Sequence, residues 1–126
     1  PINYHYWNAN WENQGFMVNI LNQSSYDHNI FPHQDCFDNH FGVVIYLNTP
    51  EECQGGTNLY SWHGYQTTPE PDMIDEPIDS GNWEVVLGLE MVYNRCVVYE
   101  SETLHMQWMN KRMYTDHDRV AQVLFM

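Results

Sequence analysis

The chain has 126 residues and a mass of 15.0 kDa, enough for one domain that buries a core without disulfides or a metal ion. Its formal net charge of −13 comes from 17 acidic and 4 basic residues, which argues against binding to nucleic acid or to an anionic membrane through a general positive field. No apolar run approaches the length of a membrane span. Short apolar runs and an aromatic content of 15% favour an all-β or β-rich fold.

The N-terminal half contains several predicted strands. Its aromatic N-terminal segment, residues 4–11, is expected to lack regular secondary structure and to cover the core. The alternative is that this segment forms a wall of the site that faces the substrate. Pro32 indicates an edge position or an irregular start for the strand in which it lies. Apolar and β-branched residues, bounded by polar residues or a Gly-Gly turn, predict strands at 16–21, 30–36, 41–48 and 57–62.

The C-terminal half begins with an acidic, Pro-rich stretch, residues 67–81, which we interpret as an exposed loop. This loop is either a lid over the substrate or a solvent-exposed loop without a functional role. Ser80 is expected to cap a short helix that continues towards Met91, although Gly88 weakens this prediction. Further strands are predicted at 95–99, 103–108 and 119–126.

About eight strands and at most one or two short helices are therefore expected. Closing many short antiparallel strands into a double sheet removes exposed sheet edges. The sequence thus predicts a single jelly-roll domain over residues 1–126, also called a double-stranded β-helix, of the cupin-like kind.

Three cysteines without a Cys-x-x-Cys pair favour a reducing, cytoplasmic compartment. Neither a signal peptide nor an initiator Met is visible, which fits a fragment or a trimmed chain.

A candidate metal site begins with the motif His33-Gln34-Asp35. Residues i and i+2 of a strand point the same way, so His33 and Asp35 are expected to project into one space. His105 can supply a third ligand. Two histidines and one carboxylate on one face of a non-haem Fe(II) ion leave positions open for a co-substrate and O2. The alternative for each histidine is a surface residue or a hydrogen-bonded core residue.

The order of motifs over residues 31–125 resembles that of the Fe(II)/2-oxoglutarate-dependent dioxygenases, in particular the prolyl-4-hydroxylase-like branch. The matching features are His33-Gln34-Asp35, the strand ending Ile45-Tyr46-Leu47-Asn48 followed by Gly55-Gly56-Thr57, the strand, turn and histidine from Cys96 to His105, and Arg119 at the start of the last strand.

This resemblance implies that His33, Asp35 and His105 bind iron. It also implies that Arg119 pairs with the distal carboxylate of 2-oxoglutarate and that the Tyr46 hydroxyl joins the same carboxylate. The implied reaction uses O2 to hydroxylate an unidentified small molecule or peptide side chain, while 2-oxoglutarate is converted to succinate and CO2.

Two positions depart from the family pattern. Many relatives place Ser or Thr two residues after the carboxylate-binding Arg, where this chain has Ala121. A Tyr commonly lies about ten residues before the His-x-Asp motif, and this chain has Gln23 there. Because an amide can donate a hydrogen bond to a carboxylate, Gln23 is a candidate contact for the co-substrate.

Alternatives remain for the anion-binding residues. Arg119 could instead pair with Asp116 or Asp118 at the surface, and Tyr46 could serve core packing alone. Arg95 is the rival anchor, or else pairs with Glu100 or Glu102. Lys111 and Arg112 are poorer candidates because they lie in a predicted loop.

Two other functions fit the same fold. The first is a non-catalytic binding or structural jelly roll, for example a carbohydrate-binding module that stacks Trp62 and Tyr65 on sugars. The second is a Zn- or Mn-dependent cupin enzyme that uses no 2-oxoglutarate. It is the less favoured because cupins usually present more histidine ligands and need no arginine anchor. Fold alone does not separate these possibilities.

Overall fold

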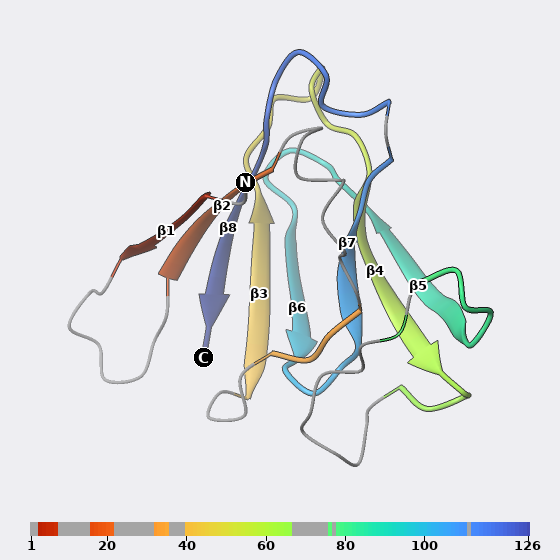
Figure 1. Cartoon of the computed structure of the whole chain (residues 1–126). Coiled ribbons are helices and arrows are strands. Elements are labelled where there is room, and N and C mark those ends of the chain that lie inside the picture. Colours follow the sequence, from red (N-terminus) through yellow and green to blue (C-terminus); the bar gives the residue numbers. More distant parts are fainter. Residues whose placement is uncertain are drawn as a thin grey trace.

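The computed structural model describes the backbone of residues 3–7 and 16–21, together with residues 32–35, 40–66, 76, 78–110 and 112–126. All regular elements among these residues are β-strands, and they form two antiparallel sheets that face each other (Figure 1). The prediction of an all-β fold is therefore confirmed. The described residues contain no helix that could span a membrane.

The larger sheet has five strands in the order β1-β2-β8-β3-β6, and the smaller sheet has three in the order β5-β4-β7. The strands of the larger sheet are β1 (Asn3–Trp7), β2 (Phe16–Leu21), β3 (Phe41–Tyr46), β6 (Cys96–Glu100) and β8 (Arg119–Phe125). Those of the smaller sheet are β4 (Gly56–Trp62), β5 (Trp83–Glu90) and β7 (His105–Trp108). The two sheets enclose the space in which the candidate site lies (Figure 1).

The core contains strand residues from both sheets, and buried and exposed positions alternate most clearly in β6. In β6, Val97 and Tyr99 are buried, whereas Val98 between them is 57% exposed. Residues of β3, β6 and β8 pack with Met91 and Met109, which directly follow strands of the smaller sheet, so both sheets share one core. The buried members of this cluster are Val44, Tyr46, Met91, Val97, Tyr99, Met109, Tyr114 and Ala121.

Two of the sequence predictions were wrong. The helix expected from Ser80 to Met91 is instead strand β5, because the segment from Trp83 to Glu90 pairs with β4, with one register shift between Leu59 and Tyr60. Part of the opening segment expected to be irregular forms β1, which pairs with β2. Residues 8–11 of that segment lie outside the described residues.

Other segments differ in extent from the predictions. Within 30–36, the described residues 32–35 make only one β-bridge, between His33 and His105, in line with the irregular start expected at Pro32. The strand predicted at 41–48 ends at Tyr46. Residues 78–81 of the predicted acidic loop are exposed and belong to no strand, and most of the rest of that loop lies outside the described residues.

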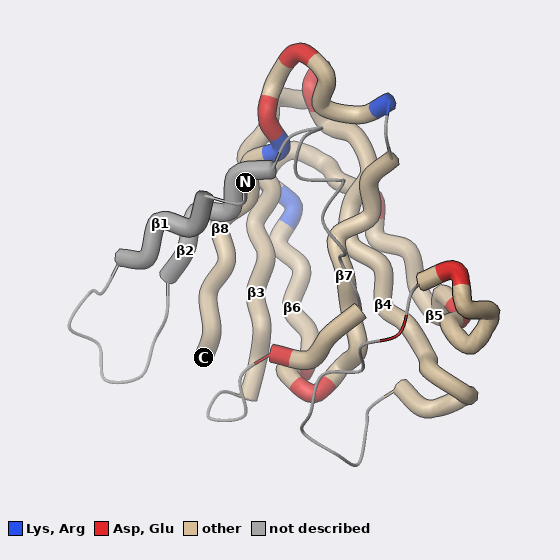
Figure 2. The backbone as a smooth tube through the Cα atoms, viewed as in Figure 1, with Lys and Arg blue, Asp and Glu red and all other residues tan. Residues whose placement is uncertain are grey.

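Charge is distributed unevenly over this framework. Figure 2 shows acidic residues on loops at both ends of the sheets and described basic residues that stand apart from one another. An anionic ligand would therefore meet single basic side chains and no extended positive surface.

Candidate metal and anion site

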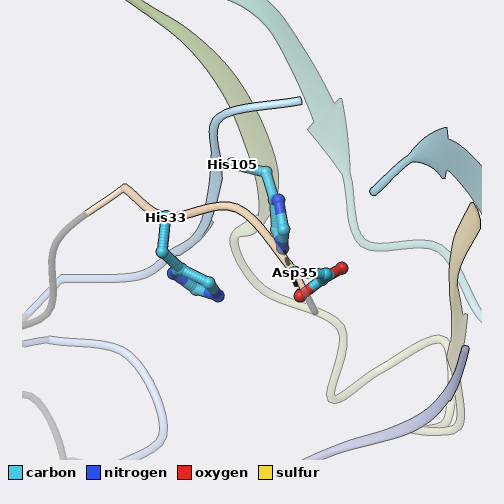
Figure 3. Close-up of side chains that lie close together, drawn as sticks. All are labelled: His33, Asp35 and His105. Carbon is cyan, nitrogen blue, oxygen red and sulfur yellow. Dashed lines mark ion pairs between the residues drawn. The ribbon is translucent and has the colours of Figure 1, made fainter. Parts of the chain in front are cut away.

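Three side chains that are separated in the sequence converge at the edge of the smaller sheet (Figure 3). His33, Asp35 and His105 each offer one ligand atom, and these atoms all lie within 4.8 Å of one another. The backbone fixes this arrangement, because the His33 and His105 peptide groups exchange two hydrogen bonds of 3.0 Å each. The Asp35 amide also donates to the Ser101 carbonyl at 2.8 Å. The structure thus brings together the three residues that the sequence analysis proposed.

Hydrogen bonding sets the tautomer of His105. Its Nδ1 lies 2.8 Å from the Thr103 carbonyl oxygen, which can only accept a hydrogen bond, so Nδ1 carries the proton. Nε2, the nitrogen left to bind a metal ion, lies 3.4 Å from Asp35 Oδ1. This is the arrangement typical of a metal-binding histidine, whose other nitrogen donates to a carbonyl or carboxylate.

The Asp35 carboxylate is nearly buried, with a side chain 8% exposed, and its Oδ2 oxygen has no hydrogen-bond partner. A buried carboxylate is costly unless a cation or several donors compensate its charge. Two imidazoles and one carboxylate form the ligand set that suits non-haem iron. The residues present therefore fit a divalent metal ion.

Gly42 makes room for this carboxylate. It lies in β3 opposite Tyr99 of β6, and a Cβ atom at this position would be 2.5 Å from Tyr99 Cε2 and 2.6 Å from Asp35 Oδ2. Such distances are far below van der Waals contact. Only glycine lets the phenol ring and the carboxylate approach the β3 backbone this closely.

A cavity of about 330 Å³ extends from the three candidate ligands between the two sheets. Its volume suits a small organic acid. Besides His33, Asp35 and His105, it is lined by Val44, Thr57, Tyr99, Gln107, Arg119, Val123 and Phe125.

Arg119 contributes the cationic group of this cavity. It is only 3% exposed, and burial lowers the pKa of its guanidinium. Its Nη2 makes a long hydrogen bond of 3.5 Å to the Gly56 carbonyl, its Nε has no partner, and no described carboxylate forms an ion pair with it. The alternative of a surface pair with Asp116 or Asp118 is therefore wrong. A buried cation that lacks a counter-anion fits an anionic ligand.

Tyr46 lies fully buried beside Arg119, with the guanidinium carbon 5.6 Å from the centre of its ring. Its hydroxyl donates to Thr57 Oγ1 at 2.7 Å, so Tyr46 does more than pack in the core. The Thr57 hydroxyl proton remains able to donate into the cavity. Thr57 thus offers a hydroxyl to the cavity, whereas Ala121, which is fully buried opposite Tyr46, has none.

The loops around the start of β8 hold Arg119 in place. The Asn48 amide donates to the Asp118 carbonyl at 2.8 Å, and its carbonyl oxygen accepts from the Val120 amide at 2.7 Å. The two nitrogens of His117 contact the Glu52 carbonyl at 3.1 Å and the Asp116 carboxylate at 2.8 Å. Both partners are acceptors, so they favour the imidazolium and raise the pKa of His117.

The remaining candidate residues lie elsewhere. Arg95 is exposed, donates to the Glu90 carbonyl at 2.7 Å, does not line the cavity, and forms no ion pair with a described carboxylate. Arg112 is also exposed, and Gln23 and Lys111 lie outside the described residues. Trp62 and Tyr65 exchange backbone hydrogen bonds of 2.7 and 2.8 Å, and the Trp62 indole donates to Glu76.

Tyr99, Thr57 and Gln107 were not predicted as site residues. Gln107 lies two residues after His105 in the same strand and opposite Thr57 in the β4–β7 ladder, so strand alternation from His105 could have indicated it. Tyr99 and Thr57 could not be identified from the sequence, because their place in the cavity depends on the register between strands.

Comparison with protein-family models, with curated proteins and with solved structures gives no match to this chain. The geometry of the site itself therefore carries its interpretation.

Proposed function

We propose that this chain is an Fe(II)- and 2-oxoglutarate-dependent dioxygenase with a jelly-roll fold, which hydroxylates a small molecule or a peptide side chain. One observation carries the proposal. A single cavity between the sheets has the two-histidine, one-carboxylate set in one part of its wall and the buried, unpaired guanidinium of Arg119 in another. A metal ion and an organic anion would together compensate the charges of Asp35 and Arg119.

Strand pairing supports the jelly-roll part of the proposal. The pairs are nested from the outermost strands inward: β2 with β8, residues 32–35 with β7, β3 with β6, and β4 with β5. Successive members of these pairs alternate between the two sheets, except at the β4–β5 connection. Nested antiparallel pairing of this kind is expected of a double-sheet jelly roll.

His33, Asp35 and His105 would hold the iron, which when bound would supply the activation of O2. The protein itself orients the ligands. The bond from His105 Nδ1 to the Thr103 carbonyl keeps the Nε2 lone pair directed into the site. Burial of the His105 and Asp35 side chains, at 7% and 8% exposed, limits the access of water.

Arg119 would bind the distal carboxylate of 2-oxoglutarate. A guanidinium meets a carboxylate through two parallel, charge-assisted hydrogen bonds, which are strong in a cavity of low dielectric constant. The hydroxyl of Thr57, positioned by its contact with Tyr46, is available as a further donor at the same end of the cavity.

Anaerobic spectroscopy followed by product analysis tests this function. Protein incubated without oxygen with Fe(II) and 2-oxoglutarate should develop a weak visible charge-transfer band, and the addition of O2 should then produce succinate. Protein loaded with Zn(II) is the matched control and should give neither signal. If the Fe(II) protein also gives neither, a non-catalytic binding module is the better account. Metal binding without 2-oxoglutarate binding would instead favour a cupin-type enzyme.

A further inference from the structure

We propose that the Tyr99 hydroxyl is a movable hydrogen-bond donor, which leaves His105 for Asp35 when the metal binds and so holds Asp35 as a ligand through one oxygen. In this role Tyr99 is a positioning residue, because it acts through the ligands. The inference rests on the metal site of the proposed function, and it adds a residue to which neither the sequence motif nor the family resemblance gives a role.

The Tyr99 hydroxyl lies at the nitrogen atom of His105 that a metal ion would need. Its hydroxyl lies 3.1 Å from His105 Nε2, and the two rings pack with centres 4.3 Å apart. Because His105 Nδ1 donates to the Thr103 carbonyl, Nε2 of a neutral imidazole can only accept, and the Tyr99 hydroxyl is then the donor in this contact. A metal ion at Nε2 would displace this hydrogen bond, and a buried hydroxyl then needs another acceptor.

Asp35 offers that acceptor. Its Oδ2 oxygen is buried and has no hydrogen-bond partner. A Cβ atom on Gly42 would be 2.6 Å from this oxygen and 2.6 Å from Tyr99 Cζ, so the carboxylate and the hydroxyl-bearing end of the phenol face the same point of the β3 backbone. Burial, the charge of Asp35 and a side-chain contact with Asp35 raise the pKa of Tyr99, so its hydroxyl lies within reach of this carboxylate.

The move has a consequence for the metal site. A hydrogen bond to a carboxylate is stronger than one to a neutral imidazole, so the displaced hydroxyl gains by moving to Asp35. An Oδ2 oxygen that accepts this bond is held away from the metal, while Oδ1, the oxygen nearest to His105, is left to bind it. Coordination through one oxygen keeps a position open for the co-substrate.

Cobalt(II) binding to a Tyr99→Phe variant tests the inference. Removal of the hydroxyl should weaken Co(II) binding about tenfold or more, the effect typical of losing a residue that orients a metal ligand. The visible Co(II) absorption should also weaken, because Asp35 is then free to bind through both oxygens and raise the coordination number. Tyr60→Phe is the matched control, since Tyr60 is also buried but is bonded to Asn58 and does not line the cavity. It should bind Co(II) with wild-type affinity and absorption.

A measurement on the wild-type protein covers the case in which the variant fails to fold. Zn(II), which does not absorb in the visible or near ultraviolet, should produce a tyrosine ultraviolet difference spectrum as the hydroxyl changes its acceptor. No such spectrum, or a Tyr99→Phe variant with wild-type Co(II) affinity and absorption, would overturn the inference alone. Wild-type protein that binds no Co(II) or Zn(II) would overturn the proposed metal site as well.

Discussion

Replacement of Arg119 by methionine is expected to stabilise the protein free of ligands by about 1–3 kcal/mol, as is common when apolar side chains of similar volume replace buried charged groups. Arg119 is 3% exposed and lacks an ion-pair partner among the described residues, so the substitution removes a long hydrogen bond to Gly56 and a contact with the Tyr46 ring but no ion pair with them. Methionine fills similar space without an uncompensated charge. Urea unfolding of the metal-free proteins measures this change.

The same substitution should remove the binding of 2-oxoglutarate. Loss of the cationic partner of a buried carboxylate costs about 3–5 kcal/mol, which corresponds to a decrease in affinity of about 100-fold or more. Calorimetric titration of 2-oxoglutarate into Zn(II)-loaded protein measures it. Arg95→Met, which changes an exposed arginine outside the cavity, is the control and should bind normally. An Arg119→Met protein that is less stable and still binds 2-oxoglutarate would refute the assignment of Arg119 as the anchor.

A Gly42→Ala substitution is expected to weaken metal binding about 100-fold, the upper end of what disturbing the residues around a metal ligand costs. The added methyl group would lie 2.5 Å from Tyr99 Cε2 and 2.6 Å from Asp35 Oδ2, so one or both side chains must move. Gly42 does not have a positive φ angle, so the steric contact alone causes the effect. Overpacking of this kind also destabilises the fold, by about 1–3 kcal/mol.

Gly88→Ala is the matched control for this prediction. Gly88 also lies in a strand, but a Cβ atom there would meet only Asn58 Oδ1, at 3.2 Å, and Gly88 does not line the cavity. Equilibrium dialysis against Mn(II) should therefore give wild-type affinity for Gly88→Ala and greatly reduced affinity for Gly42→Ala. Equal affinities for both variants would show that the packing around Asp35 does not control the metal site.

Strands whose local sequence pattern is typical of a strand could be predicted from the sequence. One strand whose local pattern is typical of a helix could not. The β-branched run at 41–48 and the segment at 119–126 correspond to β3 and β8, whose central positions in the larger sheet leave few of their residues exposed. The segment 80–91 has a capping serine and apolar residues at helical spacing, which predicted a helix. Its pairing with β4 along the whole of β5 is a tertiary interaction that no local pattern reveals.

The candidate ligands were predictable for two different reasons. His33 and Asp35 are two residues apart, and a locally extended backbone turns both towards one space even outside a regular strand. His105 was identified by the order of motifs. Tyr99 and Gly42 remained unrecognised because their importance depends on the register that places them opposite each other in β3 and β6. That Arg119 lacks a counter-ion becomes evident only in three dimensions.

Metal stoichiometry tests the central claim most directly. Anaerobic dialysis of the wild-type protein against Fe(II) should leave one ion per chain, and His105→Ala should retain none, because two of the three ligands alone bind weakly. His63→Ala, which removes an exposed histidine outside the cavity, should retain one ion. Wild-type protein without bound iron, or a His105→Ala variant that keeps its iron, would contradict the claim that these three side chains share a metal ion.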